Sequence, residues 1–148
     1  MKARMSEKAA RKRLHEANLE ITEHRLRVLM VVGNTDHPSS APEILDKISG
    51  QKDINRVTVY RILDLLVKHE VLNRLGLGEK PQRFCLRSDH EDEHPHFHCT
   101  RCNCYICLDA SDLPLDRRVL EHLPLDIRHI DVRLEGICPA CREKASRS

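Results

Sequence analysis

Four of the seven cysteines form two pairs whose spacing is typical of zinc knuckles. Cys99–Cys102 and Cys138–Cys141 each contain two cysteines separated by two residues. This spacing lets two thiolates bind one tetrahedral ion, and two such pairs complete a closed four-cysteine zinc site. The 35 residues between the pairs exceed the loop of an ordinary zinc ribbon, so a strand and a helix are expected between them. A redox role is less favoured, because a thioredoxin-like CxxC requires a βαβ context.

A third pair, Cys104–Cys107, adjoins the first one. Cys102 and Cys104 would share one face of an extended segment, where Cys104 could compete for the ion. We interpret Cys104 as a free thiol and leave the role of Cys107 open.

Histidines alternate along the chain just before the first cysteine pair. His94, His96 and His98 share one face of an extended segment, and two neutral imidazoles there can bind a transition metal. Cys85 lies on the other side of an acidic segment. A site made of Cys85, His94 and His96 would draw its ligands from both sides of that segment. A bound ion would restrict the relative orientation of two domains, which makes the ion a regulatory signal.

A helix that begins after Asn55 has the features of a DNA-recognition helix. Its apolar residues recur with helical spacing and predict a buried face: Val59, Ile62, Leu63, Leu66 and Val67. Recognition helices contact base edges and phosphates with residues near their N-terminus. The residues left for this purpose are Arg56, Thr58, Tyr60 and Arg61.

The neighbouring segments predict a winged helix-turn-helix over residues 1–86. One helix is expected from Thr22 to Gly33, and a capping box over residues 40–43 starts a short second helix. Strands over residues 71–75 and 82–86 flank a turn-rich segment and predict a β-hairpin. A hairpin after a helix-turn-helix forms the wing.

Residues 87–94 are polar and acidic and are interpreted as a hinge, and residues 95–148 predict a smaller second domain. Strands are expected over residues 96–99, 104–108 and 128–134, with one helix over residues 115–123. The predicted fold class is α+β: a winged helix-turn-helix domain followed by a small α/β domain with a four-cysteine zinc site.

Charge divides the chain in the same way. Residues 1–85 carry 16 basic and 11 acidic side chains, whereas residues 86–148 carry 9 and 12, so the first part is the candidate for phosphate contact. The apolar runs are too short to cross a bilayer, and the N-terminus has no visible secretory signal. We therefore expect a cytoplasmic protein with no membrane partner, and thiolate ligands rather than disulfides.

Taken together, these segments resemble the ferric uptake regulator (Fur) superfamily, and most of all its zinc uptake regulator (Zur) branch. The similarity covers nearly the whole chain. It rests on Thr22–Arg27, His37–Ser40, Thr58–Arg61 followed by Leu65–Leu66, and the order of histidines and cysteines. It implies a homodimeric, metal-dependent repressor of palindromic double-stranded operator DNA, with residues 95–148 as the dimerisation domain.

The resemblance also implies roles for individual residues. The structural zinc ligands would be Cys99, Cys102, Cys138 and Cys141. Tyr60 and Arg61 fall on DNA-contacting positions, and Arg25 on a basic position near the DNA backbone. The regulatory site maps to Cys85, His94 and His96, with His37 at a position that some peroxide sensors use.

The metal at the regulatory site is expected to be Zn²⁺ rather than Fe²⁺ or Mn²⁺. Zinc regulators tend to have cysteine at the position of Cys85, where iron and peroxide sensors tend to have a carboxylate. Thiolate with imidazole suits zinc, whereas carboxylate-rich sites suit manganese or ferrous iron. The chain departs from the family pattern in an inserted Glu91–Glu93 and in Leu72–Asn73, where some zinc regulators supply an acidic ligand.

Two questions stay open at this point. The fourth regulatory ligand is unassigned among His37, His98, Cys107 and Glu91, and His129 lies near a further histidine position of the family. The alternative functions are an iron- or peroxide-responsive regulator, a zinc-dependent hydrolase or deaminase, and a metal-storage protein. An enzyme is disfavoured because catalytic zinc needs an open coordination position and a nearby general base. A storage protein would not need a helix-turn-helix.

Overall fold

The computed structural model describes residues 4–48, 54–76, 81–87, 94–114, 116–128 and 130–147. It divides the chain into two compact units, Met1–Arg87 and Ser88–Ser148, which are described separately. Among the described residues no helix is long and apolar enough to span a membrane.

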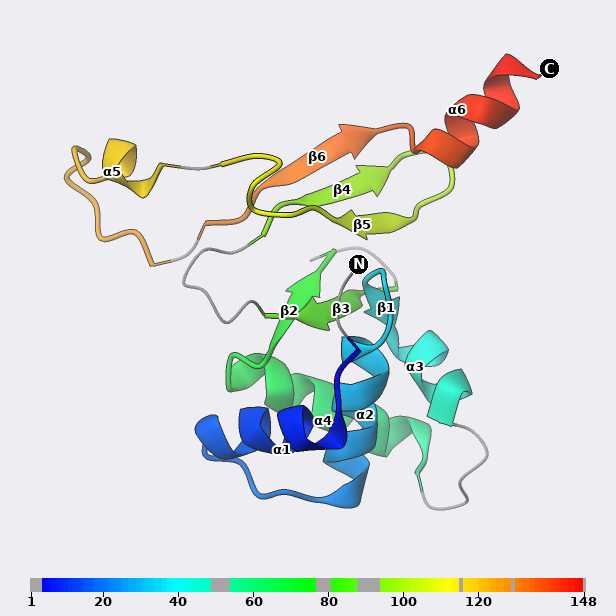
Figure 1. The fold of residues 1–148 in the computed structure, drawn as a ribbon, viewed down its shortest axis with the longest axis vertical. Coiled ribbons are helices and arrows are strands. Elements are labelled where there is room, and N and C mark those ends of the chain that lie inside the picture. The colour runs from blue at the N-terminus through cyan, green and yellow to red at the C-terminus, as the bar shows by residue number, and fades with distance from the viewer. Residues whose placement is uncertain are drawn as a thin grey trace. The chain divides into compact units, whose positions relative to one another are not determined.

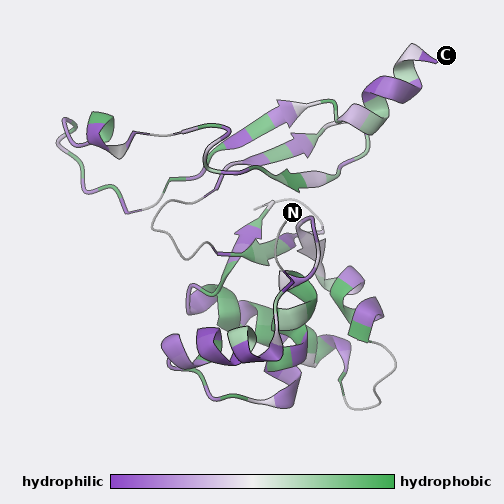
Figure 2. Cartoon of the chain, in the orientation of Figure 1, coloured by the Kyte–Doolittle hydropathy of each residue, from purple (hydrophilic) through white to green (hydrophobic). Residues whose placement is uncertain are grey.

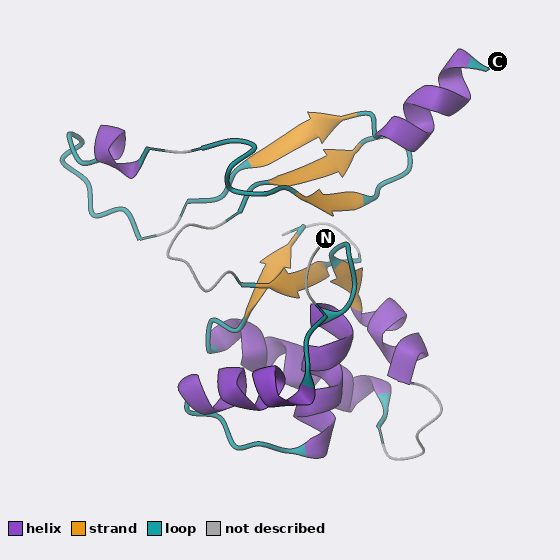
Figure 3. Ribbon diagram, viewed as in Figure 1, coloured by secondary structure: helices purple, strands orange, loops and turns teal. Residues whose placement is uncertain are grey.

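Four helices form most of the first unit (Figures 1 and 3): α1 (Glu7–Glu16), α2 (Glu23–Gly33), α3 (Ala41–Ile48) and α4 (Arg56–Lys68). Helices α2 and α4 carry long hydrophobic stretches, whereas α1 is mostly hydrophilic (Figure 2). Their apolar faces share one core. Its fully buried side chains include Leu14, Leu29, Ile44, Leu63 and Leu66.

The predicted starts of three helices are confirmed by their caps. The N–H of Arg25 donates to Oγ1 of Thr22 at 3.2 Å, which caps α2. At α3, the N–H of Glu43 donates to Ser40 Oγ at 3.4 Å and the N–H of Ser40 donates to Glu43 Oε2 at 3.3 Å, which is a reciprocal capping box. Asn55 caps α4, since its Oδ1 accepts the N–H of Thr58 at 2.9 Å.

The wing is a three-stranded sheet with the order β1-β3-β2. Strands β2 (Leu72–Leu75) and β3 (Arg83–Leu86) form the predicted antiparallel hairpin. The short strand β1 (Ser39–Ser40) pairs with the other edge of β3. The first unit is therefore a winged helix-turn-helix, as predicted.

The second unit is a small mixed sheet with the order β5-β4-β6. Strand β4 (His96–Cys99) pairs antiparallel with β5 (Tyr105–Cys107) and parallel with β6 (Arg133–Gly136). Helix α5 (Arg117–Leu120) lies between β5 and β6 in the chain, and α6 (Pro139–Ser146) follows β6. The α+β class predicted from the sequence is thus confirmed.

Several element predictions were wrong or incomplete. Helix α1 was not predicted, because its pattern is dominated by charge; Ala10 and Leu14 nevertheless bury its inner face. The strand predicted over residues 128–134 begins only at Arg133, where pairing with β4 starts. The helix expected over residues 115–123 is reduced to the four residues of α5, and α6 was not predicted.

We predict that Leu63→Ala destabilises the first unit by about 2–5 kcal/mol, because it removes a fully buried side chain and leaves a cavity. The measurement is urea unfolding of the metal-loaded protein followed by circular dichroism. The matched control is Leu65→Ala on the same helix, where the side chain is only half-buried and a smaller loss is expected. Equal losses for both variants would contradict this account of the core.

Candidate metal centres and nucleic-acid interface

Four cysteines converge at one end of the second unit. Each offers a sulfur, and the sulfurs of Cys99, Cys102, Cys138 and Cys141 all lie within 4.8 Å of one another. The Sγ atoms of Cys102 and Cys138 are 3.8 Å apart. Four sulfurs around a tetrahedral zinc ion with Zn–S bonds of about 2.3 Å would be about 3.8 Å apart. The arrangement therefore fits a single structural zinc ion.

The pairing of β4 with β6 brings the two cysteine pairs together. Cys99, at the end of β4, lies in register with Gly136, at the end of β6. The N–H of Thr100 donates to the carbonyl oxygen of Gly136 at 2.9 Å, which holds the two segments that leave these strands side by side. Cys138 follows directly, at the N-cap position of α6. One pair of parallel strands thus brings together two cysteine pairs that are separated by 35 residues in the sequence.

Backbone donors prepare two of these thiols for metal binding. The N–H groups of Cys102 and Cys138 lower the pKa of Cys99 to about 6, and the latter donates to Cys99 Sγ at 3.3 Å. The N–H of Cys104 likewise lowers the pKa of Cys102. Zinc binds the thiolate, so donors that stabilise this form favour the ion.

Cys104 packs against this cluster without being one of the four converging ligands. Burial raises the pKa of its thiol to about 12, which keeps it protonated at neutral pH. The pKa of Cys141 is also raised to about 12, chiefly by Cys138, so geometry rather than pKa separates Cys104 from the four converging sulfurs.

A second cluster of the same unit lies at the start of β4, with His94 just before the strand, and at the end of β5. The ligand atoms of His94, His96 and Cys107 lie within 4.8 Å of one another. The two imidazole rings have centroids 4.4 Å apart, and antiparallel pairing places His96 opposite Cys107. His96 is buried and the other two side chains are half-buried. Two imidazoles and one thiol form a donor set that suits a transition metal.

His98 has other partners, although it continues the alternating histidines on β4. Its ring stacks on Tyr105 with centroids 4.6 Å apart. Its Nδ1 lies 2.9 Å from Nη2 of Arg133 and 3.5 Å from Oε1 of Glu135. The structure thus separates His98 from the cluster that contains the two preceding histidines.

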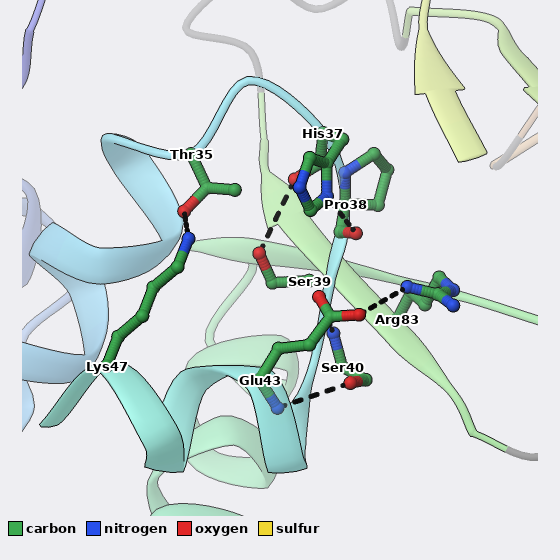
Figure 4. A network of polar contacts seen from close by, with 8 residues as sticks. All are labelled: Thr35, His37, Pro38, Ser39, Ser40, Glu43, Lys47 and Arg83. Atoms are coloured by element: carbon green, nitrogen blue, oxygen red, sulfur yellow. Dashed lines mark hydrogen bonds and ion pairs between the residues drawn. The ribbon is translucent and has the colours of Figure 1, made fainter. Parts of the chain in front are cut away.

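The other predicted regulatory ligands lie in the first unit or outside the described residues. Cys85 is buried on β3, opposite Asn73 of β2. His37 is exposed before β1, and its Nδ1 donates to the carbonyl oxygen of Pro38 at 3.0 Å (Figure 4). Glu91 and His129 fall outside the described residues.

A polar network fixes the segment that carries His37 (Figure 4). Oε1 of Glu43 accepts from Nη1 of Arg83 at 3.0 Å, which ties α3 to β3. Nζ of Lys47 donates to Oγ1 of Thr35 at 2.9 Å. Because Oε2 of Glu43 also accepts the N–H of Ser40, side chains of α3 contact the segment on both sides of His37.

Four of the five predicted DNA-contacting residues lie in the N-terminal half of α4, and the fifth, Arg25, lies on α2. Arg56, Tyr60 and Arg61 are exposed, and the guanidinium of Arg56 lies 5.5 Å from the centroid of the Tyr60 ring. Thr58 is half-buried, and its hydroxyl donates to Oδ1 of Asn55 at 3.0 Å. Arg25 is also half-buried, and its Nη1 donates to the carbonyl oxygen of Glu20 at 2.7 Å.

The sequence left the role of one residue, Cys107, undecided, and the structure places this residue in a cluster. Cys107 was open between a thiol without a role and a ligand, and it now lies beside His94 and His96. The usable signal was the strand pattern on each side of the turn, because antiparallel pairing of β4 with β5 sets Cys107 opposite His96.

Comparisons with known proteins agree with this architecture. The chain matches the ferric uptake regulator family over residues 16–130. It is 27% identical over 139 residues to a ferric uptake regulation protein of Bacillus subtilis (strain 168), with 90% of this chain and 93% of that protein covered.

Solved structures of ferric and zinc uptake regulators are also similar to this chain. The Helicobacter pylori ferric uptake regulator Fur superposes with a TM-score of 0.72 at 21% identity, covering 96% of this chain and 97% of that chain. A zinc uptake regulator complexed with zinc and DNA superposes with a TM-score of 0.68 at 25% identity, covering 95% of each chain.

The family match spans most of the chain and includes α4, the histidine–cysteine cluster and the first cysteine pair. Proteins of this family are transcription regulators that respond to metal ions and are not enzymes. With its winged helix-turn-helix and two clusters of metal-binding side chains, the chain belongs to the ferric uptake regulator family.

Proposed function

We propose that this chain is a zinc-responsive transcriptional repressor that acts in the cytoplasm and binds palindromic operator DNA as a homodimer. Each subunit would hold a structural Zn²⁺ at the four cysteines and a regulatory Zn²⁺ at a second site. The observation that carries the proposal is the cluster of His94, just before β4, with His96 of β4 and Cys107 of β5. It provides ligands that are separate from the structural site.

The donor atoms favour zinc over iron and manganese at this second site. Thiolate and imidazole suit zinc, whereas manganese and, in many sites, ferrous iron are bound through carboxylates. Cys107 supplies a thiol from within the second unit. The zinc uptake regulator with DNA shows that this fold accommodates a zinc-dependent member. Iron and manganese are the competing outcomes, and an anaerobic titration with each metal separates them.

We further propose that Cys85 completes the regulatory ligand set. Cys85 is a buried thiol at the end of the wing, and the segment from 86 to 93 joins it to the histidines. With Cys85, His94, His96 and Cys107, the site would have two thiolates and two imidazoles, a common tetrahedral zinc set. His37 is then not required, and its Nδ1 already donates to Pro38.

Such a site would couple metal binding to DNA binding. Its ligands come from both units of the chain, so a bound ion would select the arrangements of the units that bring those ligands together. An ion can shift this equilibrium only by its difference in affinity for the competing arrangements. A shift of about 1–3 kcal/mol corresponds to a 5- to 150-fold change in DNA affinity.

Helix α4 would enter the major groove. Arg61 and Arg56 would contact bases or phosphates, and Tyr60 is held against Arg56. Thr58 and Arg25 would contact the DNA backbone, although each already makes one contact within the protein. In a dimer, two such helices would read the two halves of a palindrome.

The second unit exposes several large apolar side chains on β6 and in the segment between β5 and β6. Strand β6 is at the edge of its sheet, where backbone groups can pair with another strand. Leu134 on β6 is 40% exposed and the following Ile137 is 41% exposed. In the segment between β5 and β6, Val119 and Leu125 are 67% and 66% exposed. We propose that dimerisation covers these side chains.

We predict that Cys138→Ala abolishes zinc binding at the structural site and unfolds the second unit. Because it removes a direct ligand, the loss of affinity should exceed the roughly 10- to 100-fold cost of changing a residue that only supports a ligand. Elemental analysis after mild chelation and circular dichroism measure the result. Cys104→Ala is the matched control and should keep its zinc. If Cys138→Ala retains a chelator-resistant zinc, the structural assignment is wrong.

We predict that the double variant His94→Ala with His96→Ala loses zinc-dependent DNA binding and keeps the dimer. The measurement is a gel-shift titration of operator DNA at increasing free zinc, where the 5- to 150-fold response of the unmodified protein should disappear. The control variant combines His15→Ala with His122→Ala, since both side chains are exposed and lie outside the cluster. A full zinc response of the double variant would refute the regulatory site.

We predict that Leu134→Lys weakens dimerisation about ten-fold or more, because it places a charge in a surface that must be dehydrated. Sedimentation equilibrium of the zinc-loaded protein measures the dissociation constant. Ile21→Lys, at an apolar residue of the first unit that is 37% exposed, is the control and should leave the dimer unchanged. Dimers of equal strength in both variants would exclude β6 from the interface.

A further inference from the structure

Helix α4 exposes one apolar side chain among its polar residues. Val57 is 56% exposed in the first turn, next to the exposed Arg56. The buried face of the helix is supplied by other residues: Val59, Ile62, Leu63 and Leu66. Val57 therefore adds nothing to the core of the first unit.

Valine also has an unfavourable helix propensity for this position. β-Branched residues lose rotamer freedom in a helix and are less favourable there than alanine or the long polar residues. A valine that is 56% exposed gains only part of the burial energy of a core valine in the free protein. Val57 therefore lowers the stability of helix α4 in the free protein, and contact with a partner can offset this loss.

The neighbours of Val57 indicate which partner this is. Tyr60 and Arg61 follow it by three and four residues, so the three side chains form one strip along the helix. Arg56 lies over the Tyr60 ring and adds a second positive charge beside the strip. One turn further along, Asp64 forms an ion pair with Arg74 of β2, which offsets its negative charge. The strip is therefore cationic around a single apolar group, which matches DNA better than an apolar protein surface.

One apolar group is displayed at base edges in the major groove: the 5-methyl group of thymine. We propose that Val57 is a specificity residue that contacts a thymine methyl group in each half of the operator, while Arg61 and Tyr60 contact the adjacent bases. This inference rests on the proposed DNA-binding function of α4. It adds a preference for thymine over cytosine that the polar residues of the helix do not by themselves impose.

The test compares thymine with uracil, which differs by the loss of that methyl group. The probe is a duplex selected from a random pool by the zinc-loaded protein, in which single thymines are replaced by uracil. For the unmodified protein, one thymine per half-site should show about a four-fold loss of affinity on replacement, the value expected for one buried methyl group. In Val57→Ala this loss should vanish at that position only. Alanine is a better helix former, so the variant should fold.

Ile21→Ala is the matched control, since Ile21 is also an exposed β-branched residue but lies before α2 and outside α4. It should bind the thymine and uracil duplexes with the same four-fold difference as the unmodified protein. If Val57→Ala keeps every uracil penalty of the unmodified protein, or if no thymine shows a penalty, the role of Val57 is refuted while DNA binding stands. If the unmodified protein selects no duplex at all, the proposed function itself fails.

Discussion

Strand β4 is paired on both sides, and both candidate metal sites depend on that pairing. Its antiparallel neighbour β5 places Cys107 opposite His96. Its parallel neighbour β6 places the segment that holds Cys138 beside Cys99. Because β4 carries His96 of one set of ligands and Cys99 of the other, a change in the register of β4 would disrupt both at once.

The second unit has little apolar material with which to hold this strand. Its described cluster of buried residues consists of Cys99, Cys138 and Cys141, with Phe97 and Ile106 packed against it. A sheet of three short strands is marginal without a larger core. Metal binding adds to folding energy when the ligands meet only in the folded chain. A structural zinc ion would therefore hold the strand that presents His96 to a second ion.

The first unit is built in a different way. Its core is aliphatic, and its helices begin at side-chain caps that satisfy backbone donors. Asn55 both caps α4 and accepts the hydroxyl of Thr58, so the first turn of the recognition helix is ordered before DNA arrives. The first unit is therefore held by its own aliphatic core, whereas the proposed zinc ion would hold the second unit.

Much of this structure could be predicted from local sequence. The caps at Thr22, Ser40 and Asn55 act within three residues, and the spacing of the paired cysteines indicates a tetrahedral ion. These features can therefore be predicted without the rest of the fold. The tertiary structure decided what depends on distant partners. Helix α1 exists as an ordered element because Ala10 and Leu14 find a core, and β6 begins where β4 offers hydrogen bonds. Cys107 joins two histidines through strand pairing, a nonlocal contact that no periodicity in its own segment encodes.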